Sequence, residues 1–273
     1  MINKISVLGC GWLGMPLAKF LALKGFHVKG STTSIDKIDE MKLNGIDPFT
    51  VILNPDLRTK NFAEFLNSEL LIINIPPGRV EDKVQFHTYQ LNEIVNYVKQ
   101  SAIKKIIYVS STSVYGEECG IVNEESPLNS ITDGGKAVKA AEEILQNSFS
   151  SNVTIVRFGG LIGEGRHPGR FLSYKNIFDD GNRPVNLIHQ TDCINIIFEV
   201  TKNNFFGEIF NGVCSDHPTK KEFYTKAAES LNIDPPKFID KEQRDFKIVD
   251  NQKVKEKLNY EFVYDSPLMM LKG

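Results

Sequence analysis

The chain has 273 residues, of which 41% are hydrophobic and 24% charged, and its formal net charge is −2. This length allows a large core in one domain or in one and a half, and the near-neutral charge gives no basic field, so nucleic acid is not an expected partner. Four scattered cysteines and five dispersed histidines predict neither a disulfide framework nor a metal site, and without a signal peptide or a membrane-length apolar run we expect a cytoplasmic protein with no membrane partner.

The chain begins with a predicted strand, a glycine turn and a helix. Ile5–Leu8 is a short apolar run, Met15–Lys24 has apolar residues at helical spacing, and the turn between them reads GCGWLG. In this setting GxGxxG indicates dinucleotide binding, because its glycines allow a tight turn, a close pyrophosphate and a close helix. The helix N-terminus then offers N–H groups to the phosphates. The residues expected to bind the cofactor here are Gly9, Gly11, Trp12, Leu13 and Gly14.

The second predicted strand, Phe26–Gly30, ends in hydroxyl residues where NAD-binding folds carry an acid. Ser31, Thr32 and Thr33 occupy that place, and Lys37 follows shortly after. Hydroxyls can hydrogen-bond a 2′-phosphate, and no negative charge opposes it. We therefore expect NADP as the cofactor, with NAD as the alternative, although Ser and Thr are also ordinary loop residues.

The following elements alternate between apolar runs and helical spacing, as a doubly wound sheet requires. Strands are predicted at 50–53, 70–75, 106–111, 153–158, 185–188 and 208–213, and helices at 35–44, 62–66, 81–101, 189–200 and 219–231. Ligands of such sheets bind outside the carboxyl ends of the strands, so Ile75 and Pro76 are expected to border the cofactor. The prolines that follow the run also explain its end without any ligand.

Hydroxyl residues also end the strand at 106–111. Ser110, Ser111, Thr112 and Ser113 lie there, just before Tyr115. This end of the strand should face the ligand crevice, and loop formation is the alternative explanation.

Four motifs in this order resemble the extended short-chain dehydrogenase/reductases, the NAD-dependent epimerase/dehydratase family. They are the GxGxxG turn, SSTSVYG at 110–116, RFGG at 157–160 and NLIHQTD at 186–192. The resemblance covers most of the chain and is closest to the atypical branch. It implies a dinucleotide-dependent oxidoreductase or epimerase/dehydratase with a small polar substrate. It also implies that Ser111 hydrogen-bonds the reacting oxygen, that Ser110 contacts the cofactor, and that Thr112 and Tyr115 contact the substrate.

The chain departs from this family at the general acid/base, the tyrosine of a YxxxK motif ahead of a helix that carries a glutamate. Anchoring the motif on Glu142 puts Gly134 at the tyrosine and Val138 at the lysine, and shifting it by one residue puts Gly135 at the tyrosine. A glycine cannot supply the proton transfer that accompanies hydride transfer. Two hypotheses therefore stay open, an enzyme that uses another acid and a catalytically silent dinucleotide-binding or redox-sensing protein.

A glycine-rich loop after the strand at 153–158 carries Arg166, His167 and Arg170. In the family this region opens the substrate cleft, and arginine suits bidentate binding of a carboxylate or phosphate. We expect these three residues to contact the substrate, with plain surface arginines in a mobile loop as the alternative. For His189 and Asp192 structural roles are expected.

The predicted fold is α/β, a doubly wound parallel (Rossmann) sheet with a small C-terminal substrate lobe. Residues 1–160 and 185–214 are assigned to the NAD(P)-binding domain, and residues 161–184 and 215–273 to the lobe. A small-molecule substrate is the expected partner, and a homodimer is left open.

Overall fold

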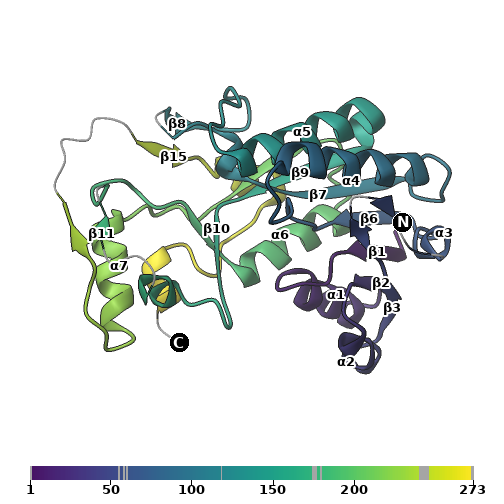
Figure 1. The fold of residues 1–273 in the computed structure, drawn as a ribbon, viewed down its shortest axis with the longest axis horizontal. Helices are drawn as coiled ribbons and strands as arrows, with labels where there is room; N and C mark the ends of the chain where they lie inside the picture. Colours follow the sequence, from purple (N-terminus) through teal and green to yellow (C-terminus); the bar gives the residue numbers. More distant parts are fainter. Residues whose placement is uncertain are drawn as a thin grey trace. The chain divides into compact units, whose positions relative to one another are not determined.

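The computed structural model describes residues 2–54, 56–57, 59, 61–117, 119–173, 177–178, 180–239 and 246–271. Its main element is a seven-stranded sheet in the order β13-β9-β7-β6-β1-β2-β3 (Figure 1). The strands are β1 (Lys4–Leu8), β2 (His27–Thr32), β3 (Ile46–Thr50), β6 (Leu70–Ile73), β7 (Lys105–Ser111), β9 (Val153–Phe158) and β13 (Ile209–Gly212). The chain moves outward from β1 in one direction and then in the other, which makes the sheet doubly wound, as predicted.

The strand order reverses at β1, so a ligand is expected at the carboxyl end of this strand. This strand runs parallel to both neighbours, with Val7 opposite Gly30 on β2 and Ile72 on β6. In sheets of this kind the ligand lies where the strand order reverses. The turn that follows β1 is therefore at the expected binding edge.

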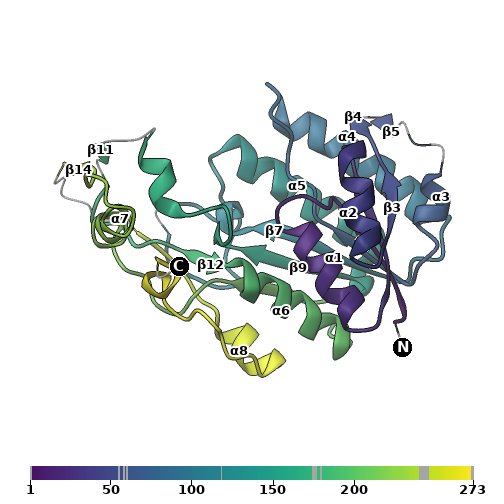
Figure 2. The ribbon, with the colours of Figure 1, turned by 90° about the horizontal axis from the view of Figure 1, so that it is seen from below.

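Helices cover both faces of the sheet (Figures 1 and 2). On one face α1 (Gly14–Leu23) and α6 (Gln190–Lys202) meet through Phe20 and Phe198, whose rings lie 5.4 Å apart. On the other, α4 (Lys83–Val98) packs along α5 (Asp133–Phe149). The remaining helices are α2 (Ile38–Leu43), α3 (Phe62–Phe65), α7 (Lys220–Glu229) and α8 (Gln252–Leu258).

The strand predicted at 50–53 lies earlier in the chain. The structure places β3 at Ile46–Thr50, with Pro48 opposite Gly30. A proline argues against a strand in the middle of a sheet, but β3 is an edge strand, where the missing N–H is tolerated.

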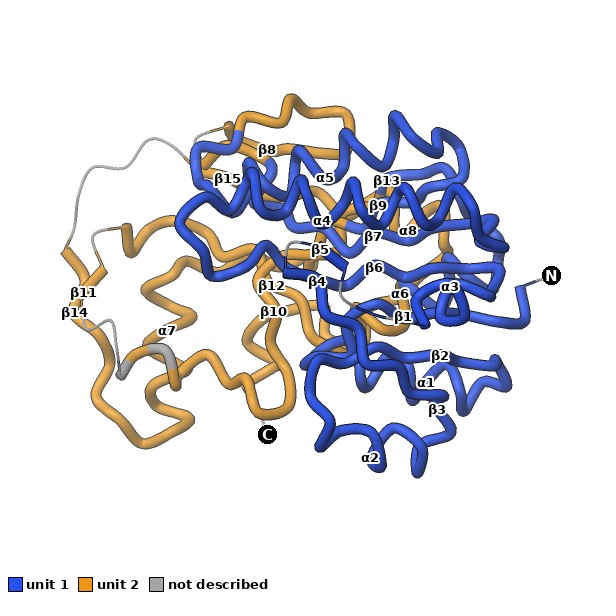
Figure 3. The backbone as a smooth tube through the Cα atoms, turned by 45° about the vertical axis from the view of Figure 1, so that its right-hand side comes forward, with its two compact units in different colours: residues 1–114, 130–156, 197–209 blue, residues 115–129, 157–196, 210–273 orange. Residues whose placement is uncertain are grey.

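The chain forms two compact units (Figure 3). The first unit contains residues 1–114, 130–156 and 197–209, and the second contains 115–129, 157–196 and 210–273. The second unit contains residues 161–184 and 215–273, which were expected to form the substrate lobe. It also contains residues 115–129, 157–160, 185–196 and 210–214, which were expected in the NAD(P)-binding domain, so the domain boundaries stay a prediction. The shorter strands are β4 (Leu53–Asn54), β5 (Asp56–Leu57), β8 (Gly120–Val122), β10 (Gly160–Ile162), β11 (Ile177–Phe178), β12 (Leu187–His189), β14 (Lys237–Phe238) and β15 (Lys247–Val249).

The second unit has its own apolar core, in which Ile162, Val185 and Phe223 are buried together. Its strands pair in parallel as β10 with β12, β8 with β15 and β11 with β14. Within the described ranges, none of the helices combines the length and apolar character that crossing a membrane requires.

Candidate functional site

The glycine turn after β1 leaves no room for side chains at its first and last glycines. Gly9 has φ +103°, and a Cβ there would lie 2.5 Å from the Asn74 carbonyl oxygen. A Cβ on Gly14 would lie 2.1 Å from the Gly9 carbonyl oxygen, whereas a Cβ on Gly11 would meet no atom within 4 Å. The turn is therefore closed toward the sheet and open at Gly11, as the approach of a pyrophosphate requires.

Two side chains outside the motif hold this turn. The Ser31 Oγ accepts a hydrogen bond from the Gly9 N–H at 2.8 Å, and the Asn74 Nδ2 donates to the Gly9 carbonyl at 3.0 Å. Both residues lie at the carboxyl ends of strands that flank β1, so the sheet register brings them to the turn. Sequence reasoning missed Asn74, whose one signal was a polar residue within the apolar run 70–75.

The start of α1 fits the phosphates of a dinucleotide. No side chain caps this helix, and its first turn has no acidic residue. Trp12 is half-buried, Leu13 is buried, and both lie between the open Gly11 and the first residue of α1. An uncapped helix N-terminus attracts anions through its backbone N–H groups and through the helix dipole. The residues present therefore fit the pyrophosphate group.

At the end of β2 the Thr32 hydroxyl is hydrogen-bonded, and the Lys37 ammonium follows shortly after in the chain. The Thr32 Oγ1 accepts from the Ser34 N–H at 3.1 Å, and Thr33 is exposed. Burial raises the pKa of the Cys10 thiol to about 12, and the Lys37 ammonium opposes this rise. A positive charge thus acts on the glycine turn from this side.

The ends of β6 and β7 carry the next predicted cofactor residues. Ile75 is half-buried and Pro76 is exposed. The Ser110 Oγ donates a short hydrogen bond to the carboxylate of Glu142 on α5, and both side chains are buried. Ser110 therefore fastens α5 to β7.

The hydroxyl of Ser111, the last residue of β7, has a different hydrogen-bonding role from that of Ser110. Its Oγ accepts from the Ser113 N–H at 3.2 Å. This bond uses a lone pair and leaves the hydroxyl hydrogen to donate elsewhere. Ser111 is half-buried and the neighbouring Thr112 is buried. Ser111 can therefore donate to a ligand oxygen at this edge of the sheet.

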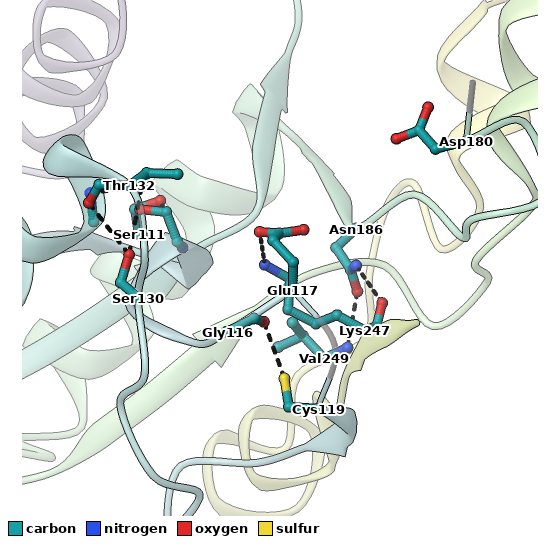
Figure 4. Close-up of polar contacts among 12 residues, drawn as sticks. Ser111, Gly116, Glu117, Cys119, Ser130, Thr132, Asp180, Asn186, Lys247 and Val249 are labelled. Atoms are coloured by element: carbon teal, nitrogen blue, oxygen red, sulfur yellow. Dashed lines mark hydrogen bonds and ion pairs between the residues drawn. The ribbon is translucent and has the colours of Figure 1, made fainter. Parts of the chain in front are cut away.

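The two glycines expected at the family's tyrosine position differ in the space around them. The Thr132 Oγ1 caps α5 by accepting from the Gly135 N–H at 3.1 Å, and the Ser130 hydroxyl lies beside it (Figure 4). A Cβ on Gly135 would lie 2.0 Å from the Ser130 Oγ, whereas one on Gly134 would meet no atom within 4 Å. Only the alignment anchored on Glu142 leaves room for a side chain at the tyrosine position.

In the second unit Tyr115 belongs to a buried polar network. Its hydroxyl donates to the Asn211 Oδ1 at 2.9 Å and accepts from the Arg157 Nη1 at 2.8 Å. The Asn211 N–H donates to the Glu124 carboxylate at 2.7 Å. With only 1% of its surface exposed, Tyr115 supports the framework of this unit, and its predicted contact with substrate stays a prediction.

The loop after β10 carries three further predicted substrate residues. Arg166 and Arg170 are exposed, and His167 is half-buried with its Nδ1 accepting from the Gly169 N–H at 3.1 Å. The structure keeps these residues in one loop, and their role in binding stays a prediction.

Another polar group of the second unit was not anticipated from the sequence (Figure 4). The Lys247 ammonium pairs with the Glu117 carboxylate at 2.7 Å. The Asn186 side chain joins β15 by donating to the Lys247 carbonyl and accepting from the Val249 N–H, both at 2.8 Å. Over the part of the chain that the structure describes, no three His, Cys, Asp or Glu side chains gather as a metal site would require.

Comparison with known proteins finds a matching family model and a relative that is similar over nearly the whole chain. The model of the NAD dependent epimerase/dehydratase family matches residues 82–211. Protein YeeZ of Escherichia coli K12 is 34% identical over 272 residues, which cover 98% of this chain and 99% of YeeZ. The chain belongs to the NAD-dependent epimerase/dehydratase family.

One more relative and one solved structure are also similar to this chain. An uncharacterized UDP-glucose epimerase of Bacillus subtilis, YtcB, is 26% identical over 186 residues, which cover 60% of this chain and 58% of YtcB. The structure of UDP-glucuronic acid 4-epimerase from Bacillus cereus in complex with NAD superimposes with a TM-score of 0.82 at 18% identity, covering 98% of this chain and 96% of the epimerase. At this identity the superposition shows the epimerase fold alone.

Proposed function

We propose that this chain is an NAD(P)-dependent oxidoreductase or epimerase/dehydratase-like enzyme that acts on a small polar substrate such as a sugar derivative. The observation that carries the proposal is the glycine turn, which is closed at Gly9 and Gly14 and open at Gly11 beside an uncapped helix. Membership of an NAD-dependent family supports it. The name of YtcB and the bound NAD of the Bacillus cereus epimerase agree with a sugar substrate and this cofactor.

In the proposed mechanism the glycine turn and the ends of β2, β6 and β7 would hold the dinucleotide. When bound, it supplies the hydride acceptor or donor. Ser111 donates a hydrogen bond to the substrate oxygen that gains negative charge, while the Ser113 N–H holds the Ser111 hydroxyl in place. Thr112, Arg166, His167 and Arg170 orient the substrate. We also keep NADP as the preferred cofactor, a cytoplasmic location and a homodimer as proposals.

A second candidate function is a catalytically silent dinucleotide-binding or redox-sensing protein. The feature that favours it is the glycine expected at the family's tyrosine position, Gly134 or Gly135, which has no side chain to transfer a proton. In this candidate the glycine turn binds the cofactor in the same way, and Ser111 is only a cofactor contact.

One set of measurements separates these functions. We would titrate the protein with NADPH and NADH by cofactor fluorescence, then incubate the complex with nucleotide sugars, free sugars and small carboxylates. Cofactor absorbance would report net oxidation or reduction, and NMR of the products would report epimerisation. Micromolar binding with turnover supports the enzyme. Binding without turnover of any substrate supports the silent protein, and absence of binding overturns both.

A further inference from the structure

The second unit contains a hollow of about 390 Å³, a volume typical of small-molecule sites. Its walls come from four separate stretches of the chain, which are the end of β10 with the loop after it, the end of β12, the segment after α7 and the C-terminal stretch after α8. The residues that face it include Ile162, His167, Arg170, His189, Tyr264 and Met270. The hollow therefore lies among residues far apart in the sequence, within a single compact unit.

The wall formed by the C-terminal stretch is fixed by Asp192, a fully buried residue in the first turn of α6. Its carboxylate accepts from the Tyr260 hydroxyl at 2.6 Å, from the Val263 N–H at 2.8 Å and from the Tyr264 N–H at 3.1 Å. These bonds hold Tyr264 so that its ring lies 3.9 Å from that of His189. The aromatic wall is therefore formed before any ligand arrives.

The hydrogen bonds of the two histidines fix where their protons lie. The His189 Nδ1 accepts from the Thr191 N–H at 3.2 Å, so the hydrogen of the neutral ring is on Nε2. The His167 Nδ1 likewise accepts from the Gly169 N–H, and its Nε2 faces the Ser230 hydroxyl at 3.3 Å. Burial lowers the pKa of both rings, which favours their neutral forms. His189, one of the residues that line the hollow, thus carries its N–H donor on Nε2.

The charged groups of the hollow are one guanidinium and one carboxylate. Arg170 lies close enough to His167 for its charge to lower the pKa of that ring further. Glu164 faces the same hollow, and its side chain is exposed to solvent. The remaining walls, from Leu231 and Met270, are apolar.

We propose that this hollow binds the anionic end of the substrate, a phosphate or carboxylate carried on a small organic body. The Arg170 guanidinium and the His189 Nε2–H donate to the anion, and the Tyr264 ring and its apolar neighbours contact the body. This inference rests on the proposed function, because it takes the ligand to be that enzyme's substrate. It adds the residues His189, Tyr264 and Asp192, of which Asp192 acts by positioning the wall.

The test is a titration of the intact protein followed by NMR of the histidine rings, whose five signals are assigned by single substitutions. The probes are glucose 1-phosphate, glucuronic acid, glucose and inorganic phosphate. We expect one of the two charged sugars to shift the His189 signal saturably and to bind at least about tenfold more tightly than glucose or inorganic phosphate. Which of them binds distinguishes a phosphate from a carboxylate.

Arg170→Met should weaken that binding about 10- to 100-fold, since a charge-assisted hydrogen bond is lost. Lys226→Met, which removes an exposed cation of the same unit on α7, should change it less than twofold. Glu164→Gln should tighten it a few-fold. Equal losses in the Arg170 and Lys226 variants, binding of glucose as tight as that of the charged sugars, or an unmoved His189 signal would overturn the inference.

The same samples separate this inference from the proposed function. Fluorescence of NADPH reports the glycine turn in the first unit. Cofactor binding and turnover with an unmoved His189 signal overturn the inference alone. A saturable His189 shift without any dinucleotide binding overturns the proposed function and, with it, the identity of the ligand as that enzyme's substrate.

Discussion

Serines that look alike in the sequence have different partners in the structure. Ser31 holds the glycine turn, Ser110 donates to the buried Glu142, and Ser111 accepts from a backbone N–H with its own hydrogen still available. Ser110 and Ser111 differ because successive residues of β7 point to opposite faces of the sheet. A hydroxyl-rich strand end therefore contains both structural and chemically available groups.

Ser111→Ala should slow the chemical step by about 10²–10³ if the protein is an enzyme, since one donor to a developing oxyanion is lost. Cofactor affinity should barely change. Ser113→Ala is the matched control, because it keeps the backbone N–H that donates to Ser111. Single-turnover kinetics and cofactor fluorescence measure the two effects. An activity that survives in the Ser111 variant would mean that other residues carry the reaction, with Arg166 and His167 as the next candidates.

Cofactor choice should depend on Thr32 and Lys37. Thr32→Asp puts a carboxylate at the end of β2, where repulsion of a 2′-phosphate at ~4 Å and an effective dielectric of ~20 amounts to about 4 kcal/mol before screening. We expect this variant to prefer NADH, and Lys37→Met to weaken NADPH more than NADH. Calorimetric titration with both cofactors checks this. Tighter binding of NADH by the parent protein would refute the expected preference for NADP.

At the scale of the elements, a buried chain of hydrogen bonds links β7 to α4. The Tyr108 hydroxyl contacts the His87 Nε2 and the His87 Nδ1 contacts the Gln90 Oε1, each at 3.1 Å. The Gln90 Nε2 donates to the Leu53 carbonyl at 2.8 Å, so its Oε1 accepts from His87. These roles put a hydrogen on the His87 Nδ1, and in the neutral ring, which burial favours, the Nε2 accepts from the Tyr108 hydroxyl.

Because of these hydrogen bonds around His87, the free energy of unfolding should fall as the pH falls below about 6.5. Burial lowers the pKa of His87 from its ordinary 6.5, so the unfolded state takes up a proton there before the folded state does. Each proton bound only by the unfolded state lowers the free energy of unfolding by at most about 1.4 kcal/mol per pH unit. Urea unfolding between pH 7.5 and 5 should show a shallower pH dependence for His87→Phe. An unchanged slope would contradict this role.

The start of α5 offers a test with two adjacent glycines. Gly135→Ala drives a Cβ into the Ser130 Oγ and the Ser113 carbonyl, at 2.0 and 2.3 Å, and should destabilise the fold by about 1–3 kcal/mol. Gly134→Ala meets no atom and should stabilise the helix by roughly 0.5–1 kcal/mol. Denaturant unfolding of both variants measures the difference. Equal changes in the free energy of unfolding for the two variants would contradict the difference in space between Gly134 and Gly135.

At the scale of the whole molecule, local patterns predicted the elements and distant contacts completed the site. The apolar runs and the glycine turn indicated the doubly wound sheet, because each strand buried on both faces leaves its own signal. Asn74 contacts Gly9 across 65 positions of sequence, and Asp192 contacts Tyr260 across 68. Such pairs depend on which strands become neighbours, and no local pattern encodes them. The edge strand β3 was misplaced for a similar reason, since Pro48 is acceptable only at an edge.

Cofactor binding at the glycine turn should be measurable as a rise in the free energy of unfolding of the whole protein. A ligand that binds only the folded state at 100 times its Kd raises the free energy of unfolding by about 2.7 kcal/mol. Gly11→Val places a branched side chain where a Cβ meets no protein atom, so the unliganded variant should unfold at the parent's denaturant midpoint. The same side chain blocks the approach of the phosphates, so NADPH should no longer raise that midpoint. Gly14→Val, whose Cβ would strike the Gly9 carbonyl, should instead be destabilised without any cofactor. A Gly11 variant that NADPH still stabilises like the parent would show that the dinucleotide binds elsewhere.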